Sequence, residues 1–284
     1  MIRIVDTHLH LWDLSRFRYS WCAGIVSLNR SYLMTDYLEA GEGKGIHQSV
    51  YVDADVDEPD MKSEVQWVLE QARDPRNPLS ALVIKALPEL EDFPKLLDRY
   101  GGEPLIKGIR RVLHTQPDDL SRSEMFRQNL RLLSGRNWTF DLCFLGRQLP
   151  IAIELVDACP KVQFVLDHCG VPDIKGGALD PWREHIRLLA ERPNVIACKV
   201  SGLVAYAGPD WKTQDLKPYV NHVVECFGPD RLMFGSDWPV CTLGGSLAKW
   251  IDTAHELTSS WSDSEREKFF AGNACNVYRL GDHP

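Results

Sequence analysis

The sequence lacks any run of about 18 consecutive apolar residues, the length that a membrane-spanning helix requires. It shows no basic segment followed by an apolar stretch near its start, so we expect no signal peptide and a cytoplasmic protein. Basic residues are the minority, because 32 Lys and Arg face 40 Asp and Glu and give a net charge of −8. This balance argues against a nucleic-acid-binding protein, and we expect neither nucleic acid nor a membrane as a partner.

Several sequence motifs of known chemistry are also missing. The eight cysteines are scattered without a C-x-x-C pair, so a thiolate zinc site is not expected, and we interpret them as small buried residues of a reducing compartment. No G-x-S-x-G motif is present, which argues against a serine hydrolase. A glycine-rich phosphate loop is absent too, which weakens the case for a doubly wound open sheet.

The chain alternates short apolar runs with longer stretches of helical spacing. Most of the short runs are apolar on both faces, as parallel strands covered by helices are. Helical spacing fills the gaps between them and is clear at 61–72, 121–133, 180–192 and 212–227. The pattern predicts a (β/α)8 TIM barrel that forms one domain over residues 1–284, with the open sheet as the alternative. The eight expected strands are 2–8, 47–54, 81–88, 105–113, 138–144, 162–168, 195–202 and 231–237.

Polar residues end several of these strands, where the active site of such a barrel is formed. His8 and His10 are two apart on the first strand and therefore share a face. Asp237 ends the strand that closes against the first, and His168 ends a strand across the mouth. Three imidazoles and a carboxylate suit one divalent metal such as zinc. They equally suit a metal-free site, where imidazoles polarise a carbonyl and the carboxylate takes a proton from water.

Each of these residues alone has an ordinary structural explanation. A histidine at a strand end is usually a hydrogen-bonded structural residue, and Asp237 before Trp-Pro could cap a turn. Their coincidence at the ends of expected barrel strands favours the functional interpretation. His114 follows the fourth strand and is the one other histidine to check. Structural roles are expected for His47, His114, His185, His222, His255 and His283.

Five further residues are candidates for substrate binding. Arg110 would share the inward face of its strand with Gly108 and Val112. Lys199 either contacts the substrate or pairs with a carboxylate across the barrel, because a buried charge needs a partner. Those carboxylates would be Asp141 or Asp167. The aromatic rings expected to stack on a substrate at the mouth are those of Trp12 and Trp238, together with Trp21.

These motifs together resemble the amidohydrolase superfamily, and within it a branch of small lactonases. The branch includes L-fuconolactonase-like, L-rhamnonolactonase-like and 2-pyrone-4,6-dicarboxylate lactonases. The resemblance runs through the whole chain in order. The motifs that carry it are VDTHLHLW, KGIRRVL, FVLDHCG, CKVSGL, MFGSDWPV and GNACNVYRL.

The resemblance implies a (β/α)8 barrel in which water attacks a lactone carbonyl. In that scheme Asp237 is the general base, and Arg110 contacts the substrate. The three imidazoles either bind a divalent metal or polarise the carbonyl directly. The wider superfamily has a His after the fifth strand, whereas this chain shows Asp141 and Cys143 there. A binuclear metal set is therefore incomplete, which leaves one metal or none.

The leading hypothesis is a cytoplasmic enzyme of sugar catabolism that opens a neutral aldonolactone, such as L-fuconolactone or L-rhamnonolactone. The few cationic groups near the expected mouth make a dianionic 2-pyrone-4,6-dicarboxylate the less favoured substrate. Two competing hypotheses are a metal-dependent decarboxylase of the same superfamily and a non-catalytic binding protein. The segment 15–37 is expected to fold over the mouth. The oligomeric state is left open.

Overall fold

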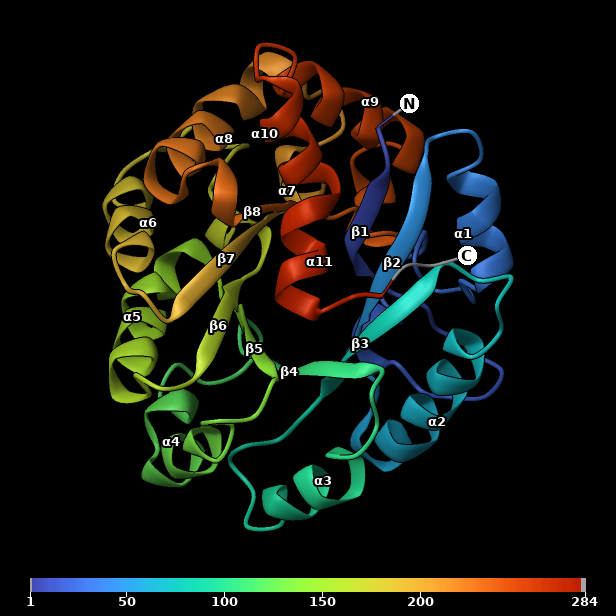
Figure 1. Ribbon diagram of the computed structural model, residues 1–284, viewed down its shortest axis with the longest axis vertical. Helices are drawn as coiled ribbons and strands as arrows, with labels where there is room; N and C mark the ends of the chain where they lie inside the picture. The colour runs from blue at the N-terminus through green and yellow to red at the C-terminus, as the bar shows by residue number, and fades with distance from the viewer. Residues whose placement is uncertain (1, 282–284) are drawn as a thin grey trace.

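The structure is a computed structural model that describes residues 2–281, so the expectation for His283 falls outside the described residues. Eight strands alternate with helices along the chain (Figure 1). The strands are β1 (Ile4–Leu9), β2 (Ile46–Val52), β3 (Leu79–Lys85), β4 (Ile106–Val112), β5 (Thr139–Cys143), β6 (Gln163–Leu166), β7 (Val195–Val200) and β8 (Leu232–Phe234). The helices are α1 (Met34–Ala40), α2 (Met61–Ala72), α3 (Phe93–Tyr100), α4 (Glu124–Arg131), α5 (Leu149–Ala158), α6 (Trp182–Ala190), α7 (Leu203–Ala207), α8 (Thr213–Phe227), α9 (Leu247–Leu257), α10 (Asp263–Glu267) and α11 (Asn273–Tyr278).

The strands form a single parallel sheet in the order β1 to β8, and the sheet curls into a barrel surrounded by helices (Figure 1). The last strand returns beside the first, where Leu9 pairs with Trp238 in a parallel bridge. The hydroxyl of Thr7 also donates to the carbonyl of Phe234 at 2.7 Å. The (β/α)8 prediction is therefore confirmed, and the open-sheet alternative is wrong because β8 lies next to β1.

Small apolar side chains fill the inside of the barrel, and α11 covers one end of it (Figure 1). Parallel strands that are buried on both faces need apolar side chains on both, which explains the runs in the sequence. Tyr278 of α11 seals this inner cluster, and its ring lies 6.0 Å from the ammonium of Lys199. The strand residues of the inner cluster are Val5, Val50, Val52, Ala81, Val83, Val165, Ala197 and Met233.

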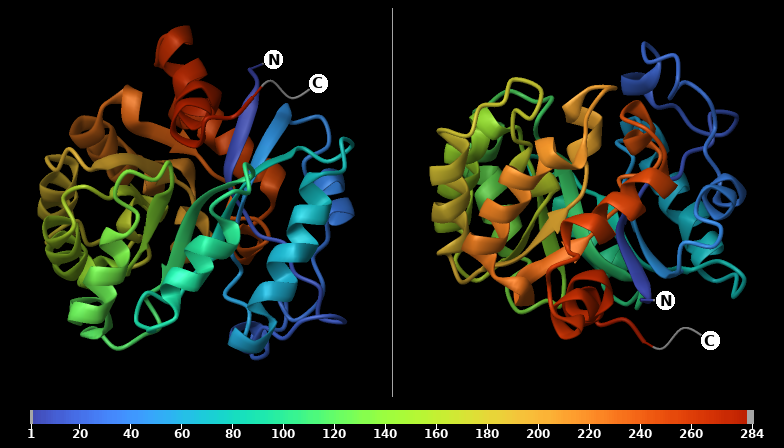
Figure 2. Two further views of the ribbon diagram at one scale, coloured as in Figure 1. Left: turned by 60° about the horizontal axis from the view of Figure 1, so that its bottom comes forward. Right: turned by 90° about the horizontal axis from the view of Figure 1, so that it is seen from above.

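A long connection between β1 and β2 lies at the end of the barrel opposite the start of β1 (Figure 2). Trp12 and Tyr32 close the part of this connection that precedes α1 with a pair of backbone hydrogen bonds of 3.0 and 2.8 Å. This end is formed by the carboxyl ends of the strands, where barrel enzymes carry their active sites. Within residues 2–281, none of the helices is long and apolar enough to cross a membrane.

Candidate active site

The seam between β1 and β8 brings three of the predicted residues together. The backbone N–H of Asp237 donates to the carbonyl of His8, and that of His10 donates to the carbonyl of Trp238, both at 2.8 Å. Gly235 permits this approach, because a Cβ there would lie 2.9 Å from the Cβ of His8. Backbone hydrogen bonds therefore hold His8 of β1 and His10, just beyond it, beside Asp237.

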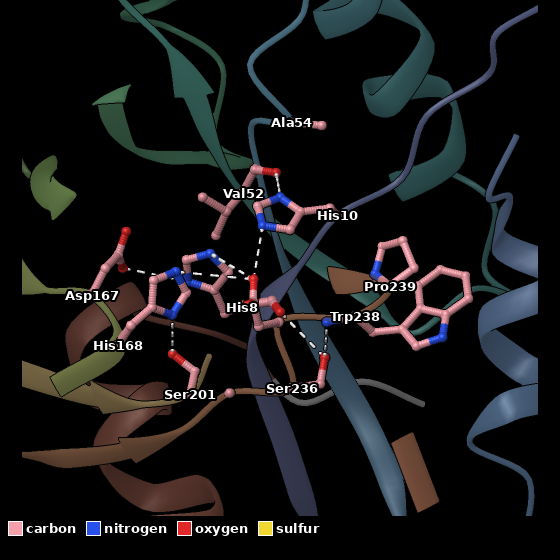
Figure 3. A network of polar contacts seen from close by, with 12 residues as sticks. His8, His10, Val52, Ala54, Asp167, His168, Ser201, Ser236, Trp238 and Pro239 are labelled. Atoms are coloured by element: carbon pink, nitrogen blue, oxygen red, sulfur yellow. Dashed lines mark hydrogen bonds and ion pairs between the residues drawn. The ribbon is translucent and has the colours of Figure 1, made fainter. Parts of the chain in front are cut away.

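One carboxylate oxygen of Asp237 lies at the centre of three imidazoles. Its Oδ1 is 3.3 Å from Nε2 of His10 and 3.9 Å from Nε2 of both His8 and His168. His8 lies on β1, His10 directly after it, His168 in the turn after β6 and Asp237 in the turn after β8. Figure 3 shows the rings of the three histidines close together. The four residues that the sequence predicted for one site are thus brought to one point.

The other ring nitrogen of each imidazole is held by a neighbouring group (Figure 3). Nδ1 of His10 donates to the carbonyl of Val52 at 2.9 Å, and Nδ1 of His168 shares a hydrogen bond of 2.9 Å with the hydroxyl of Ser201. Nδ1 of His8 lies 3.4 Å from a carboxylate oxygen of Asp167. The carbonyl of Val52 can only accept, so Nε2 of a neutral His10 carries the lone pair. Ser201 holds the ring of His168, and Asp167 together with the ammonium of Lys199, 3.4 Å from Nδ1, holds that of His8.

Burial favours the neutral form of two imidazoles in this cluster. It lowers the pKa of His8 well below its ordinary value and also lowers the pKa of His168. A neutral imidazole offers a lone pair, which is what a metal ion or a proton on the reacting water requires.

The donor set fits one divalent ion. Nitrogen and oxygen ligands of zinc lie at about 2.0–2.2 Å from the metal, so ligand atoms around it are about 3.4 Å apart, close to the separations here. Ligand atoms of His8, His168 and Asp237 all lie within 4.8 Å of one another. Nη1 of Arg110 points at His8 Nε2 from 3.2 Å, so metal binding through that nitrogen requires Arg110 to give up this contact.

A cavity of about 260 Å³ opens beside the cluster. His10, His168, Asp237 and Arg110 contribute to its polar side. It lies where the connections after β1, β2, β4, β7 and β8 meet, as expected for a barrel enzyme. A small molecule in this cavity would meet both the carboxylate and the imidazoles.

Comparison with known proteins agrees with this geometry. A family model described as amidohydrolase matches residues 5–280. The chain belongs to the amidohydrolase family. It is similar to two proteins named L-fucono-1,5-lactonase. The one from Burkholderia multivorans is 31% identical over 97% of this chain and 96% of its own length, and the one from Burkholderia ambifaria is 28% identical over 99% and 96%.

A solved amidohydrolase from Burkholderia multivorans with bound zinc is similar across the whole barrel. It has a TM-score of 0.87 at 28% identity and covers 98% of this chain and 100% of its own. The resemblance inferred from the motifs is thereby confirmed at the level of the family. The donor set of His8, His168 and Asp237 in the present chain is also consistent with a divalent metal.

In the present chain Lys199 does not reach the cavity, which corrects the prediction that it contacts the substrate. Its ammonium is fully buried below the imidazoles and is hydrogen-bonded to Asp141, with Asp167 at 3.1 Å. Burial alone would lower the pKa of Lys199, and the two carboxylates reverse this effect and raise it. These ion pairs are the second role that the sequence allowed for Lys199.

Two tryptophans also need correction, because neither Trp12 nor Trp238 is among the described residues that line the cavity. The indole N–H of Trp12 donates to the carbonyl of Arg30 at 2.6 Å, and both rings are buried against Tyr32. Trp21 lines the cavity instead, with its N–H bonded to the carbonyl of Ala54 at 2.7 Å.

Arg110 lies at the cavity as predicted, but three interior groups share its guanidinium. Nε donates to Oδ2 of Asp53 at 2.7 Å, and Nη2 donates to the carbonyl of the same residue. Nη1 lies 3.4 Å from Asp167 and 3.2 Å from Nε2 of His8. Arg110 therefore joins the end of β2 to the imidazole cluster.

Sequence reasoning missed Asp53, Asp55 and Tyr206. The first two follow the apolar run of β2, so the search for polar strand ends could have found them. Tyr206 lies on the five-residue helix α7, which has no recognisable periodicity. Tyr206 lines the cavity, as does His114, whose pKa burial lowers to about 4.

Three residues that border the cavity adopt the left-handed backbone region. The φ angles are 53° for Asp55, 53° for His168 and 56° for Asp237. Asp and His tolerate this region better than most residues, yet each such position costs on the order of 1–3 kcal/mol. The surrounding fold stabilises these conformations where a strand ends, and each one turns a polar side chain toward the cavity.

Proposed function

We propose that this amidohydrolase hydrolyses a sugar lactone of the aldonolactone type to its acid. The observation that carries the proposal is the single carboxylate oxygen of Asp237, which faces the Nε2 atoms of three imidazoles beside a small cavity. The similarity to proteins named L-fucono-1,5-lactonase supports the substrate class. We also predict that the reaction takes place in the cytoplasm as part of sugar catabolism.

In this proposal Asp237 acts as the general base. It accepts a proton from water while the water oxygen bonds to the lactone carbonyl carbon. The bond between that carbon and the ring oxygen then breaks, and the proton returns from Asp237 to the ring oxygen, which leaves as a hydroxyl. The atoms therefore balance as lactone plus water giving one hydroxy acid.

The charge that develops on the carbonyl oxygen would be held by an ion bound to the Nε2 lone pairs or, without an ion, by an imidazole that carries its proton on Nε2. A zinc ion held by His8, His168 and Asp237, with His10 beside it, would act as a Lewis acid and lower the pKa of bound water. Arg110 is proposed to contact the substrate, which its place in the cavity lining supports. Val52, Ser201 and Asp167 keep the three rings in position throughout.

The test is acid release from L-fucono-1,5-lactone, L-rhamnono-γ-lactone and 2-pyrone-4,6-dicarboxylate, followed with a pH indicator against buffer alone. Metal content is measured on the same preparation before and after chelation. We expect turnover of the sugar lactones, with loss of activity that tracks loss of zinc if the ion takes part. Absence of hydrolysis with every lactone would overturn the proposal, and release of carbon dioxide from an aromatic acid would favour a decarboxylase.

A further inference from the structure

Three histidines are among the described residues that line the cavity, and the proposed mechanism does not use one of them, His114. It follows β4 and lines the cavity together with Cys143, the last residue of β5. The backbone N–H of Leu113 donates to the carbonyl of Cys143 at 3.2 Å, which holds the segment after β4 beside the end of β5. The barrel wall itself therefore places the ring of His114.

The thiol of Cys143 selects one tautomer of this ring. Sγ of Cys143 lies 3.3 Å from Nδ1 of His114, a hydrogen-bond distance for sulfur. Burial raises the pKa of the Cys143 thiol, so the sulfur keeps its proton. Because sulfur is a weak acceptor and the lone pair of a neutral imidazole is a good one, the S–H donates to Nδ1. The proton of the ring is then on Nε2.

The ring of His114 is neutral near neutral pH. Burial lowers its pKa to about 4, and the positive charge of Arg110 acts in the same direction. A neutral imidazole with its proton on Nε2 offers one N–H donor at that atom. Such a donor can bind an uncharged oxygen without bringing an unpaired charge into the cavity.

The donor at Nε2 of His114 is free. Within residues 2–281 this atom has no hydrogen-bond partner, and it is not one of the polar atoms that are closed off from solvent. The Nε2 atoms of three other imidazoles surround Oδ1 of Asp237. His114 therefore lies beside the proposed reacting centre without being part of it, and its N–H is open to another part of a bound molecule.

We propose that His114 is a specificity-determining residue, whose Nε2–H donates a hydrogen bond to a hydroxyl oxygen of the substrate away from the reacting carbonyl. Cys143 is the positioning residue that keeps the proton on Nε2. This inference rests on the proposed lactone hydrolysis and adds a contact with a part of the substrate that does not react. The alternative is the structural role expected from the sequence, in which the pair with Cys143 only joins the ends of β4 and β5.

Two variants of His114 each keep one half of its contacts. The amide of Asn ends near the position of Nδ1, so His114→Asn keeps a partner for Cys143 and loses the substrate donor. The amide of Gln reaches the position of Nε2, so His114→Gln does the reverse. We expect His114→Asn to raise KM for L-fucono-1,5-lactone by about 3–10-fold with little change in kcat, as one uncharged hydrogen bond predicts. His114→Gln should keep KM within about twofold of the original.

A matched substrate and a matched residue serve as controls. δ-Hexalactone has the ring and the methyl group of L-fucono-1,5-lactone but no hydroxyl, so its KM, or its inhibition constant if it is not turned over, should be the same in all three proteins. His222 and Cys226 form a similar pair on α8, with Nε2 and Sγ 3.4 Å apart, and neither residue lines the cavity. His222→Asn should leave kcat and KM unchanged for both lactones.

The position of the proton on His114 is measured without substrate. Two-bond proton–nitrogen NMR spectra of isotope-labelled protein distinguish the two tautomers, and His114→Gln identifies the signal of this ring. We expect the proton on Nε2 in the original protein and in Cys143→Ser, because a serine hydroxyl also donates to Nδ1. In Cys143→Ala the donor is lost, and we expect a mixture of both tautomers.

The outcomes separate this inference from the proposed function. An unchanged KM in His114→Asn, a larger effect in His114→Gln, or an equal effect on δ-hexalactone would overturn the substrate contact and leave lactone hydrolysis standing. A proton on Nδ1 in the original protein would overturn the role of Cys143. Failure to hydrolyse any lactone would remove the proposed function and the substrate contact together, whatever tautomer the spectra show.

Discussion

At the residue scale, Asp237 combines two constraints in one position. Its backbone N–H is bonded to the carbonyl of His8, and its φ of 56° turns the carboxylate toward three imidazoles. A side chain held at both levels is preorganised, because little of its freedom is lost when the reaction begins. A substitution that keeps the shape of this side chain should therefore change the activity and leave the stability of the fold unchanged.

Asp237→Asn should therefore lower kcat by about 10²–10⁴-fold, because the amide keeps the shape of the carboxylate but accepts no proton. The melting temperature should stay close to that of the original protein. Asp252→Asn, at an exposed carboxylate paired with Lys44, is the control and should leave kcat unchanged. Turnover of Asp237→Asn at the original rate would exclude this residue as the base.

Lys199 gives a second prediction, about stability. Lys199→Met leaves the buried carboxylates of Asp141 and Asp167 without their ammonium partner, which should lower the free energy of unfolding by about 3–5 kcal/mol. Adding Asp141→Leu should recover part of the loss. Urea unfolding of the three proteins checks this. A variant that unfolds like the original and changes KM alone would restore the substrate-contact prediction.

The sequence predicted which face these residues occupy but not how deep they lie. His8 and Lys199 both point into the barrel, and only the packed structure shows that the ammonium lies below the imidazoles, where Asp141 and Asp167 pair with it. Trp12 was misplaced for a similar reason. A ring in a long connection turns toward whichever neighbours exclude water from it, here Tyr32.

At the element scale, the strands could be predicted because burial on both faces leaves continuous apolar runs. Their ends were less predictable. The run 162–168 was expected as strand, but β6 stops at Leu166, and β8 stops at Phe234 rather than at 237. His168 and Asp237 have left-handed backbone angles that no strand accommodates, so neither residue can belong to the strand that precedes it.

Helix α7 shows the same relation between an element and the site. It is bracketed by Gly202 and Gly208, with φ angles of 68° and 85°, and carries Tyr206 at the cavity. A Cβ at Gly202 would lie 2.5 Å from Nδ1 of His168, whereas one at Gly208 would meet no atom of the described chain within 4 Å. The first glycine is thus required for space as well as for conformation.

Gly202→Ala should displace the ring of His168 and lower kcat/KM by roughly 10–100-fold, as loss of a ring-positioning contact at a metal or catalytic histidine does. Gly208→Ala imposes backbone strain at a positive φ without the contact and serves as the control. Both variants should have lower melting temperatures than the original protein, Gly202→Ala from strain and contact together and Gly208→Ala from strain alone. Equal losses of activity in the two would show that strain in α7, and not the position of His168, controls turnover.

At the scale of the whole molecule, closure of the barrel produces the site. His8 and Asp237 are far apart in the sequence and meet only where β1 and β8 come together. The active end then depends on the connection after β1, which packs down onto α2. There the hydroxyl of Tyr19 donates to the buried carboxylate of Glu64 at 2.7 Å. Because the carboxyl of Glu64 titrates, the stability of this contact depends on pH.

Burial raises the pKa of Glu64 to about 8 in the folded protein, above its ordinary value of 4.5. Between these two values the unfolded chain releases the proton first, so rising pH favours unfolding until about pH 8, where the effect levels off. The shift corresponds to roughly 5 kcal/mol of stability lost across this window.

Glu64→Gln should remove this dependence, because the amide does not titrate. Urea unfolding at pH 5, 7 and 9 should show a variant close to the original at pH 5 and more stable than it at pH 9. Since buried histidines titrate in both proteins, the difference between the two curves isolates Glu64. A constant difference across the three pH values would mean that Glu64 is ionised in the folded protein already at pH 5, and that the connection after β1 is held to α2 by a charged rather than a neutral carboxyl.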